Sequence, residues 1–100
     1  MAKGYWLAQV DVTDPDVYKS YIAANQIAFR KFGARYVARA GRHAAVEGTW
    51  RSRIVVIEFK DYDTALACYH SPEYQHAITL RKGNAVADIA VVEGYEGPQP

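Results

Sequence analysis

The 100-residue chain has a single cysteine, almost no excess charge of either sign and no long apolar run. A lone Cys68 excludes a disulfide within the chain, and its apolar helical surroundings predict a buried, unreactive thiol. With 12 Lys and Arg against 11 Asp and Glu, the net charge of +1 would not attract nucleic acid or an anionic membrane. No apolar segment approaches the roughly 20 residues that span a bilayer, and no signal-peptide pattern opens the sequence. We therefore expect a cytoplasmic protein whose partners include neither nucleic acid nor membrane.

Apolar and aromatic residues are abundant and make up 50% of the chain. This share and this length suit one domain with a modest core. We expect the domain to cover residues 1–95 and residues 96–100 to form a disordered tail.

Hydrophobic patterns predict four strands, over residues 5–12, 34–40, 54–60 and 88–93. The third of these is the clearest, because its β-branched residues run without Gly or Pro. A polar stretch over residues 41–51 is expected to be a loop or hairpin tip.

Capping residues predict where the helices lie. Asp14 can accept hydrogen bonds from the free amides of a first turn, Pro15 suits the first helical position, and Gly33 ends this helix. Asp61 begins the second helix. The Ser71-Pro72 pair repeats the cap-then-proline pattern, so the second helix kinks or restarts there.

The element order is therefore βαββαβ. Two interleaved right-handed crossovers give an α+β fold of ferredoxin-like topology. We expect a four-stranded antiparallel sheet with both helices on one face.

Three of the expected strands are apolar on both faces, as in residues 5–8, 54–57 and 89–92. An exposed face of an antiparallel sheet normally shows a polar residue at every second position. A patch this apolar would exceed what soluble monomers usually expose, and no third helix is available to cover it. A second copy of the chain is the simplest cover, so we expect a homodimer.

Strand parity suggests a first candidate site. Side chains alternate between faces, which places Gln9 and Glu58 on the partner side of the sheet and, by the same count, Arg39 with them. These three groups would then converge within an apolar cavity, as in a small-molecule site, with Glu58 as an acid or base. The alternative is a structural ion pair between Arg39 and Glu58, since a buried carboxylate needs a partner.

A second candidate cluster surrounds the interrupted helix. His70 could act as an acid or base near neutral pH, or serve as a helix cap or surface group. Tyr69 and Tyr74 are candidate ligand contacts or core aromatics with their hydroxyls at a rim. Arg81 either binds an anion or complements the helix dipole. Ser71 is interpreted as a cap, because a proline follows it and no base is paired with it.

The sequence indicates neither a metal nor a nucleotide cofactor. His70 and His76 lie six residues apart, on different faces of a helix, and His43 falls in the expected loop. No glycine-rich phosphate cradle or dinucleotide fingerprint occurs. We therefore expect no metal and no cofactor.

Motifs spread along the chain resemble the family called domain of unknown function 1330. The most specific are the Ile57-Glu58-Phe59 strand and the Ser71-Pro72-Glu73-Tyr74 turn. The remaining matches are Asp14, Tyr18 to Tyr21, Gly33, Arg39, Glu47-Gly48, Val55-Val56, Tyr69, Gln75, Arg81 and Glu93-Gly94. The resemblance covers residues 4–94 and implies a dimeric α+β barrel, in which two sheets face each other.

This chain departs from the family pattern at three positions. In the family pattern two glycines follow the arginine that matches Arg39, and here Ala40 stands in place of the first. Cys68 stands in place of an aromatic residue, and His70 in place of a small polar one. The last departure weakens the case for His70 as a shared catalytic group.

Three functions fit these observations. The first is a cofactor-independent enzyme that acts on a small aromatic or carbonyl metabolite by acid–base chemistry. The second is a ligand-sensing module without turnover, and the third is a dimerisation domain whose polar cluster is structural. Relatives of the barrel include cofactor-free monooxygenases, muconolactone isomerases and ligand-sensing domains, so the fold does not choose among them.

Overall fold

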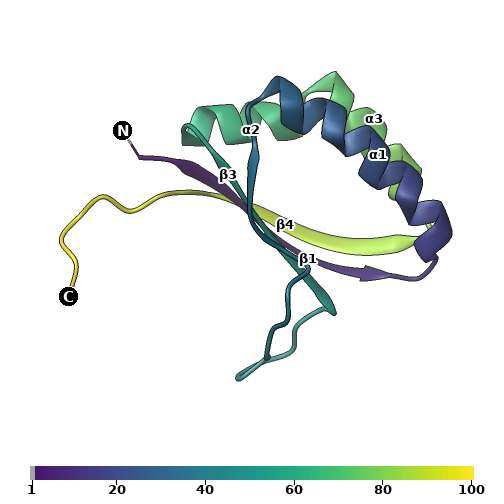
Figure 1. Ribbon diagram of the computed structural model, residues 1–100, viewed down its shortest axis with the longest axis horizontal. Helices are drawn as coiled ribbons and strands as arrows, with labels where there is room; N and C mark the ends of the chain where they lie inside the picture. The colour runs from purple at the N-terminus through teal and green to yellow at the C-terminus, as the bar shows by residue number, and fades with distance from the viewer. Residues whose placement is uncertain (1) are drawn as a thin grey trace.

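The computed structural model describes residues 2–100, which form one four-stranded sheet and three helices (Figure 1). The first half of the chain forms strand β1, helix α1 and strand β2. The second half forms β3, the two consecutive helices α2 and α3, and β4. The bounds are β1 Gly4–Val12, α1 Pro15–Lys31, β2 Arg35–Arg39, β3 Arg53–Phe59, α2 Tyr62–His70, α3 Pro72–Arg81 and β4 Ala85–Glu93.

Each helix begins at the residue that the capping pattern predicts. The Asp14 carboxylate accepts a hydrogen bond from the Val17 amide at 3.2 Å, and the Asp61 carboxylate accepts one from the Thr64 amide at 2.7 Å. Ser71 ends α2 and begins α3, because its hydroxyl accepts from the Tyr74 amide at 3.2 Å. The interrupted helix is therefore a restart: two helices that share one capping serine.

The strands lie in the order β2-β3-β1-β4, and every neighbouring pair is antiparallel. In the centre of the sheet Trp6 pairs with Ile57 on β3 and with Val91 on β4. The structure confirms the α+β class with a four-stranded antiparallel sheet. Strand β4 begins at Ala85, three residues before the predicted start at residue 88, because it pairs with β1 as far as Val12.

The core lies between the sheet and the helices and is centred on Trp6, which is 1% exposed. Its ring contacts those of Phe29, Phe59 and Tyr74, with centroids 5.4, 5.5 and 4.8 Å away. Its indole nitrogen donates a hydrogen bond to the Ala65 carbonyl of α2 at 2.8 Å. One tryptophan thus ties the central strand to all three helices, and its polar atom is satisfied.

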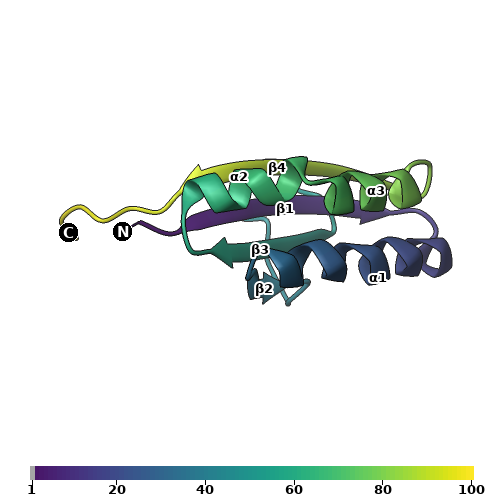
Figure 2. The same cartoon turned by 90° about the horizontal axis from the view of Figure 1, so that it is seen from above.

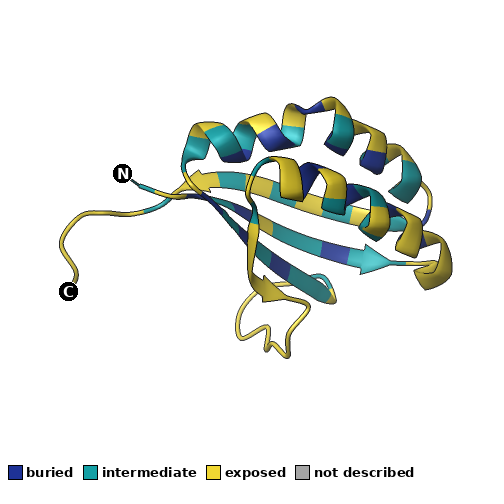
Figure 3. Ribbon diagram, turned by 45° about the horizontal axis from the view of Figure 1, so that its top comes forward, coloured by how far each residue is buried: buried dark blue, intermediate teal, exposed yellow. Residues whose placement is uncertain are grey.

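All three helices cover the same face of the sheet, with α1 along the β3 side and α2 and α3 along the β4 side (Figure 2). We call the other face the outer face. No helix within residues 2–100 covers it. Exposed and half-buried residues alternate along much of β4 (Figure 3). Leu7, Val86 and Val92 on this face are 45%, 50% and 42% exposed. No helix within this described part of the chain has the length and apolar character needed to cross a membrane.

A bulge interrupts the edge strand β2. Tyr36 and Ala38 pair with successive residues of β3, so Val37 between them has no partner. Such an extra residue reverses the alternation of side chains in the rest of the strand. Beyond the bulge, Ala40 adopts a left-handed backbone with φ of 51° while its amide donates to the Ile54 carbonyl at 2.9 Å.

Candidate functional site

A small cavity of about 40 Å³ lies between the sheet and the helices. We call it the inner cavity. Its walls are mostly apolar or aromatic, and its polar groups are phenols, an amide and two guanidinium groups. The lining residues are Trp6, Ala8, Val10, Tyr18, Tyr21, Ile22, Asn25, Phe29, Tyr36, Arg39, Arg53, Val55, Ile57, Tyr74, Ala87 and Ile89.

A tyrosine pair forms one wall of the inner cavity. The hydroxyls of Tyr21 on α1 and Tyr74 on α3 lie 2.6 Å apart and share a buried hydrogen bond. Burial raises the pKa of Tyr74 well above its ordinary value, Tyr21 adds to the rise, and Arg81 opposes it. Burial also raises the pKa of Tyr18. The neighbouring tyrosine Tyr21 raises it further, whereas Arg53 and Arg81 lower it. Tyr18 and Tyr74 are therefore neutral at physiological pH and can donate hydrogen bonds.

Three arginines surround these tyrosines. Arg53 opens β3 and lines the cavity, and Arg39 lines it from the end of β2, its guanidinium carbon 4.3 Å from the centre of the Tyr36 ring. Arg81 ends α3 beside the cavity, its guanidinium carbon 5.5 Å from the centre of the Tyr21 ring. None of the residues that line the cavity is Asp, Glu or His. The cavity therefore combines apolar walls with positive charge and hydrogen-bond donors.

The exposed lining residues mark the mouth of the inner cavity. Tyr36 and Arg39, both on the edge strand β2, are the two lining residues that are exposed to solvent. The Tyr36 hydroxyl also accepts a hydrogen bond from the Gln26 amide of α1 at 2.7 Å. The mouth of the cavity therefore lies at the edge strand β2.

A wider and shallower hollow of about 510 Å³ lies on the outer face. It is mainly apolar and is lined by Leu7, Ala8, Gln9, Trp50, Ile54, Val56, Asp88, Ile89 and Ala90. Trp50 comes from the loop between β2 and β3 and is 53% exposed.

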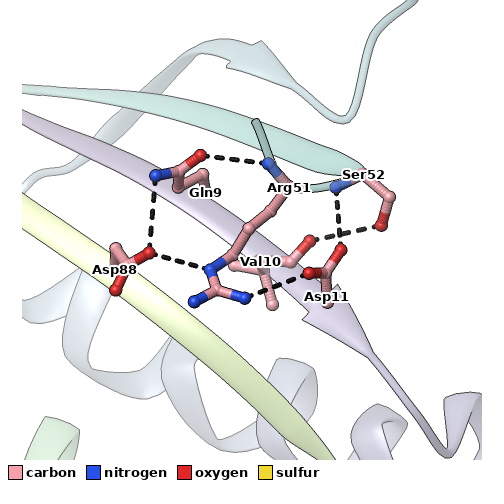
Figure 4. A network of polar contacts seen from close by, with 6 residues as sticks. All are labelled: Gln9, Val10, Asp11, Arg51, Ser52 and Asp88. Carbon is pink, nitrogen blue, oxygen red and sulfur yellow. Dashed lines mark hydrogen bonds and ion pairs between the residues drawn. The ribbon is translucent and has the colours of Figure 1, made fainter. Parts of the chain in front are cut away.

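A polar network closes one end of this outer hollow (Figure 4). The Gln9 side chain accepts a hydrogen bond from the Arg51 amide at 3.1 Å and donates one to Asp88 at 3.4 Å. The Arg51 guanidinium forms ion pairs with Asp88 at 2.8 Å and Asp11 at 3.1 Å. Because these groups satisfy one another, the network fixes the start of β3 and the loop before it.

The structure separates the three residues of the first predicted site. Gln9 belongs to the polar network, whereas Glu58 lies farther along the outer face and pairs with Lys3 at 3.5 Å. Arg39 pairs across the sheet with Val55, whose side chain is buried toward the helices, and lines the inner cavity. The prediction that Gln9, Arg39 and Glu58 converge is wrong, because the bulge at Val37 places Arg39 on the opposite face.

The second predicted cluster is partly brought together. Tyr74 lines the inner cavity and Arg81 lies beside it. Tyr69 packs its ring against Trp6 and Tyr74, with centroids 5.8 and 5.4 Å away, behind the cavity wall. His70 is exposed at the end of α2, its ring 5.3 Å from that of Tyr69, and does not line the cavity.

Five polar residues of the inner cavity were not singled out as site residues from the sequence: Tyr18, Tyr21, Asn25, Tyr36 and Arg53. In the sequence, Tyr18 and Tyr21 were noted only among the residues that carry the family resemblance. A signal for Arg53 exists in the strand pattern, since it shares the parity of Val55 and Ile57, which face the helices. Tyr18, Tyr21 and Asn25 give a comparable signal, because hydroxyl and amide groups on the buried face of a helix need hydrogen-bond partners.

Residues that could hold a metal are not grouped in the structure. Within residues 2–100, no three His, Cys, Asp or Glu side chains are placed to share an ion. Cys68 is buried, and burial together with Glu73 raises the pKa of its thiol to about 12. Thiolate chemistry at neutral pH is therefore disfavoured at this position.

The fold recurs in solved structures of low sequence identity. A protein of unknown function from Rhodopseudomonas palustris is 14% identical, with a TM-score of 0.72 and coverage of 96% of this chain and 85% of that one. SnoaB, a cofactor-independent oxygenase from Streptomyces nogalater, is 11% identical, with a TM-score of 0.66 and coverage of 100% and 97%. A dimeric protein of unknown function and ferredoxin-like fold from Bacteroides fragilis is 15% identical, with a TM-score of 0.58 and coverage of 91% and 95%.

These similarities define the class as α+β proteins of ferredoxin-like fold. The model of the domain of unknown function DUF1330 matches residues 3–95, and the chain belongs to that family. The resemblance drawn from the sequence motifs is thereby confirmed. No curated protein matches the sequence.

Proposed function

We propose that the protein is a homodimer in which each protomer binds a small metabolite at the inner cavity and its mouth. The observation that carries the binding function is the inner cavity itself, where phenol and guanidinium groups from four elements converge between apolar walls. A few convergent polar groups in an apolar pocket are typical of small-molecule sites. The outer hollow is larger, but its polar groups already satisfy one another.

The outer face supports the homodimer. Its exposed side chains include Leu7, Val86 and Val92, and the hollow beside them is mainly apolar. A matching sheet from a second copy would bury these side chains on both sides. The dimeric neighbour from Bacteroides fragilis has a fold of the same class and agrees with this assembly. The cytoplasmic location stays a prediction from the sequence.

The chemistry available in the inner cavity is hydrogen-bond donation and positive charge. No lining carboxylate or imidazole can remove a proton from a ligand, and His70 lies outside the cavity. The groups present would polarise a carbonyl or stabilise negative charge that develops on a ligand oxygen. SnoaB shares the fold and is a cofactor-independent oxygenase, which agrees with such a site working without a cofactor. We therefore favour electrostatic stabilisation over acid–base catalysis by either of the two separate candidates, Glu58 and His70.

A thermal-shift screen of small aromatic and carbonyl metabolites tests the binding function. A ligand at one hundred times its dissociation constant stabilises the folded state by about 2.7 kcal/mol. Ala87→Leu, which adds bulk to the inner cavity, should abolish the shift caused by a hit, whereas Ala23→Leu on the exposed side of α1 should preserve it. Each shift is measured against the same variant without ligand, since added bulk can itself destabilise.

A variant in the outer hollow shows which result would contradict the proposed site. Ala90→Leu adds bulk there. If Ala90→Leu abolished the shift and Ala87→Leu did not, the ligand site would be the outer hollow and the proposal would be wrong. Turnover of a hit would identify an enzyme, and binding without turnover would identify a sensor.

A further inference from the structure

We infer that the ligand of the inner cavity presents an anionic oxygen group, such as a carboxylate or another oxyanion, to Arg53 and Arg81. This inference rests on the binding function proposed above and specifies the class of ligand. Three features of the cavity carry it: unbalanced charge, an excess of donors and the size of the enclosed space.

The positive charge around the cavity is not balanced by protein groups. Within residues 2–100, no ion pair joins a carboxylate to Arg39, Arg53 or Arg81. Arg51, two residues before Arg53, shows the opposite arrangement, with two aspartates bound to its guanidinium. A ligand carboxylate would supply to Arg53 the partner that the protein supplies to Arg51.

Two of these guanidinium groups also have buried atoms without a partner. The Nε atoms of Arg53 and Arg81 are both buried and make no hydrogen bond. A buried donor that makes no hydrogen bond costs free energy, so an acceptor that reaches it gains that free energy on binding. Arg53 lines the cavity together with Tyr18 and Tyr21, and Arg81 lies over the Tyr21 ring, so both arginines lie beside the same group of tyrosines.

The tyrosines add a hydroxyl donor to those of the guanidinium groups. Tyr21 and Tyr74 have two hydroxyl hydrogens between them, and their shared bond uses one. The second hydrogen is available to a ligand. The Asn25 side-chain oxygen, the cavity's amide acceptor, already accepts from Gln26 at 2.8 Å. Such a donor-rich lining suits an oxyanion, which only accepts hydrogen bonds.

The volume of the cavity limits what enters it. About 40 Å³ holds about three or four waters, since one water needs about 10–15 Å³ of such space. This space fits a carboxylate group but not a whole metabolite. The rest of the ligand would lie at the mouth, against the exposed Tyr36 ring and the Arg39 side chain stacked on it. A carboxylate with an apolar or aromatic body meets both requirements: the carboxylate fits the cavity, and the body lies at the mouth.

Matched pairs of acids and amides test the inference by NMR titration. Acetate, benzoate and phenylacetate are compared with acetamide, benzamide and phenylacetamide, which keep the shape and remove the charge. The Nε–Hε signals of Arg53 and Arg81 report directly on the groups invoked, and Arg53→Met and Arg81→Met assign them. We expect at least one acid to shift these signals and to bind about tenfold or more tightly than its amide.

A matched variant separates the cavity from general charge. Arg53→Met should remove the preference for the acid, whereas Arg42→Met, in the exposed loop, should leave it unchanged. If Arg53→Met fails to fold, the inference is still tested in two ways. The wild-type titration compares each acid with its amide, and Arg53→Lys, which keeps the charge but loses Nε, shows whether the preference for the acid depends on that atom.

Two results would overturn the inference. Equal affinity for acid and amide, with both shifting cavity signals, would reject the anion and leave the binding function standing. Failure of every probe, and of every hit from the thermal screen, to shift any cavity signal would reject the inference and the binding function together.

Discussion

Single residues at the end of β2 determine which polar groups reach the inner cavity. Val37 has no partner in the sheet, and this one extra residue turns Arg39 from the outer face to the face of the helices. Three residues later, Ala40 holds a left-handed backbone at the start of the loop that carries Trp50. Most side chains are strained in that conformation, and glycine is not.

The first prediction concerns this strained alanine. Ala40→Gly should stabilise the fold by about 0.5–1 kcal/mol, because relief of strain at φ of 51° exceeds the added freedom of the unfolded chain. Urea denaturation measures the free energy of unfolding. Ala38→Gly is the control, since Ala38 lies in β2 without positive φ and should lose stability. A loss of stability in Ala40→Gly would show that the left-handed conformation is not strained.

At the scale of elements, Ser71 joins two helices that would otherwise be one. Its hydroxyl accepts from the Tyr74 amide of α3 and donates to the Cys68 carbonyl of α2 at 2.7 Å. The change of direction at this residue brings Tyr74 from α3 into contact with Tyr21 from α1, 53 residues away. The geometry of the cavity wall thus depends on where α2 ends.

The second prediction is that Ser71→Ala costs about 1 kcal/mol of stability, the usual cost of a lost helix cap. Thr79→Ala removes a hydroxyl from an exposed position of the same helix and should change stability by less than about 0.5 kcal/mol. Thermal or urea unfolding of both variants gives the comparison. Equal stability of Ser71→Ala and the wild type would show that the helix restart does not depend on this cap.

For the whole molecule, the outer face is the feature that the single chain leaves incomplete. Helices cover one face only (Figure 2), and the apolar side chains of Leu7 and Val92 remain exposed on the other. The polar network around Arg51 lies at one end of this face and leaves its apolar part open (Figure 4). A partner sheet would therefore meet an apolar centre bordered by charges.

The third prediction tests this assembly. The wild type should sediment at about twice the 11.2 kDa chain mass at micromolar concentration. Val56→Asp should give monomers or unfold, because Val56 lines the outer hollow and the change places an unpaired charge in the proposed sheet-to-sheet contact. Val17→Asp is the matched control, since Val17 is exposed in the first turn of α1, where a negative charge is favourable. A monomeric wild type, or an intact dimer in Val56→Asp, would refute the proposed interface.

The sequence by itself determined the elements, their order and the class of fold. Asp14, Asp61 and Ser71 mark helix starts through contacts within a single turn, and the alternation in β1 and β3 assigns Trp6 and Val55 to the buried face. These features depend on neighbours a few residues away, so the local pattern is enough to predict them.

Only the tertiary structure decided where the polar groups meet. The bulge at Val37 cannot be counted from an alternating pattern, and a shift of one residue reverses the face of Arg39. The contact of Tyr21 with Tyr74 links two helices that pack side by side. Arg53 lines the same cavity from strand β3. The candidate site moved from the outer face to the inner cavity because contacts between distant segments depend on register and packing, which no local pattern contains.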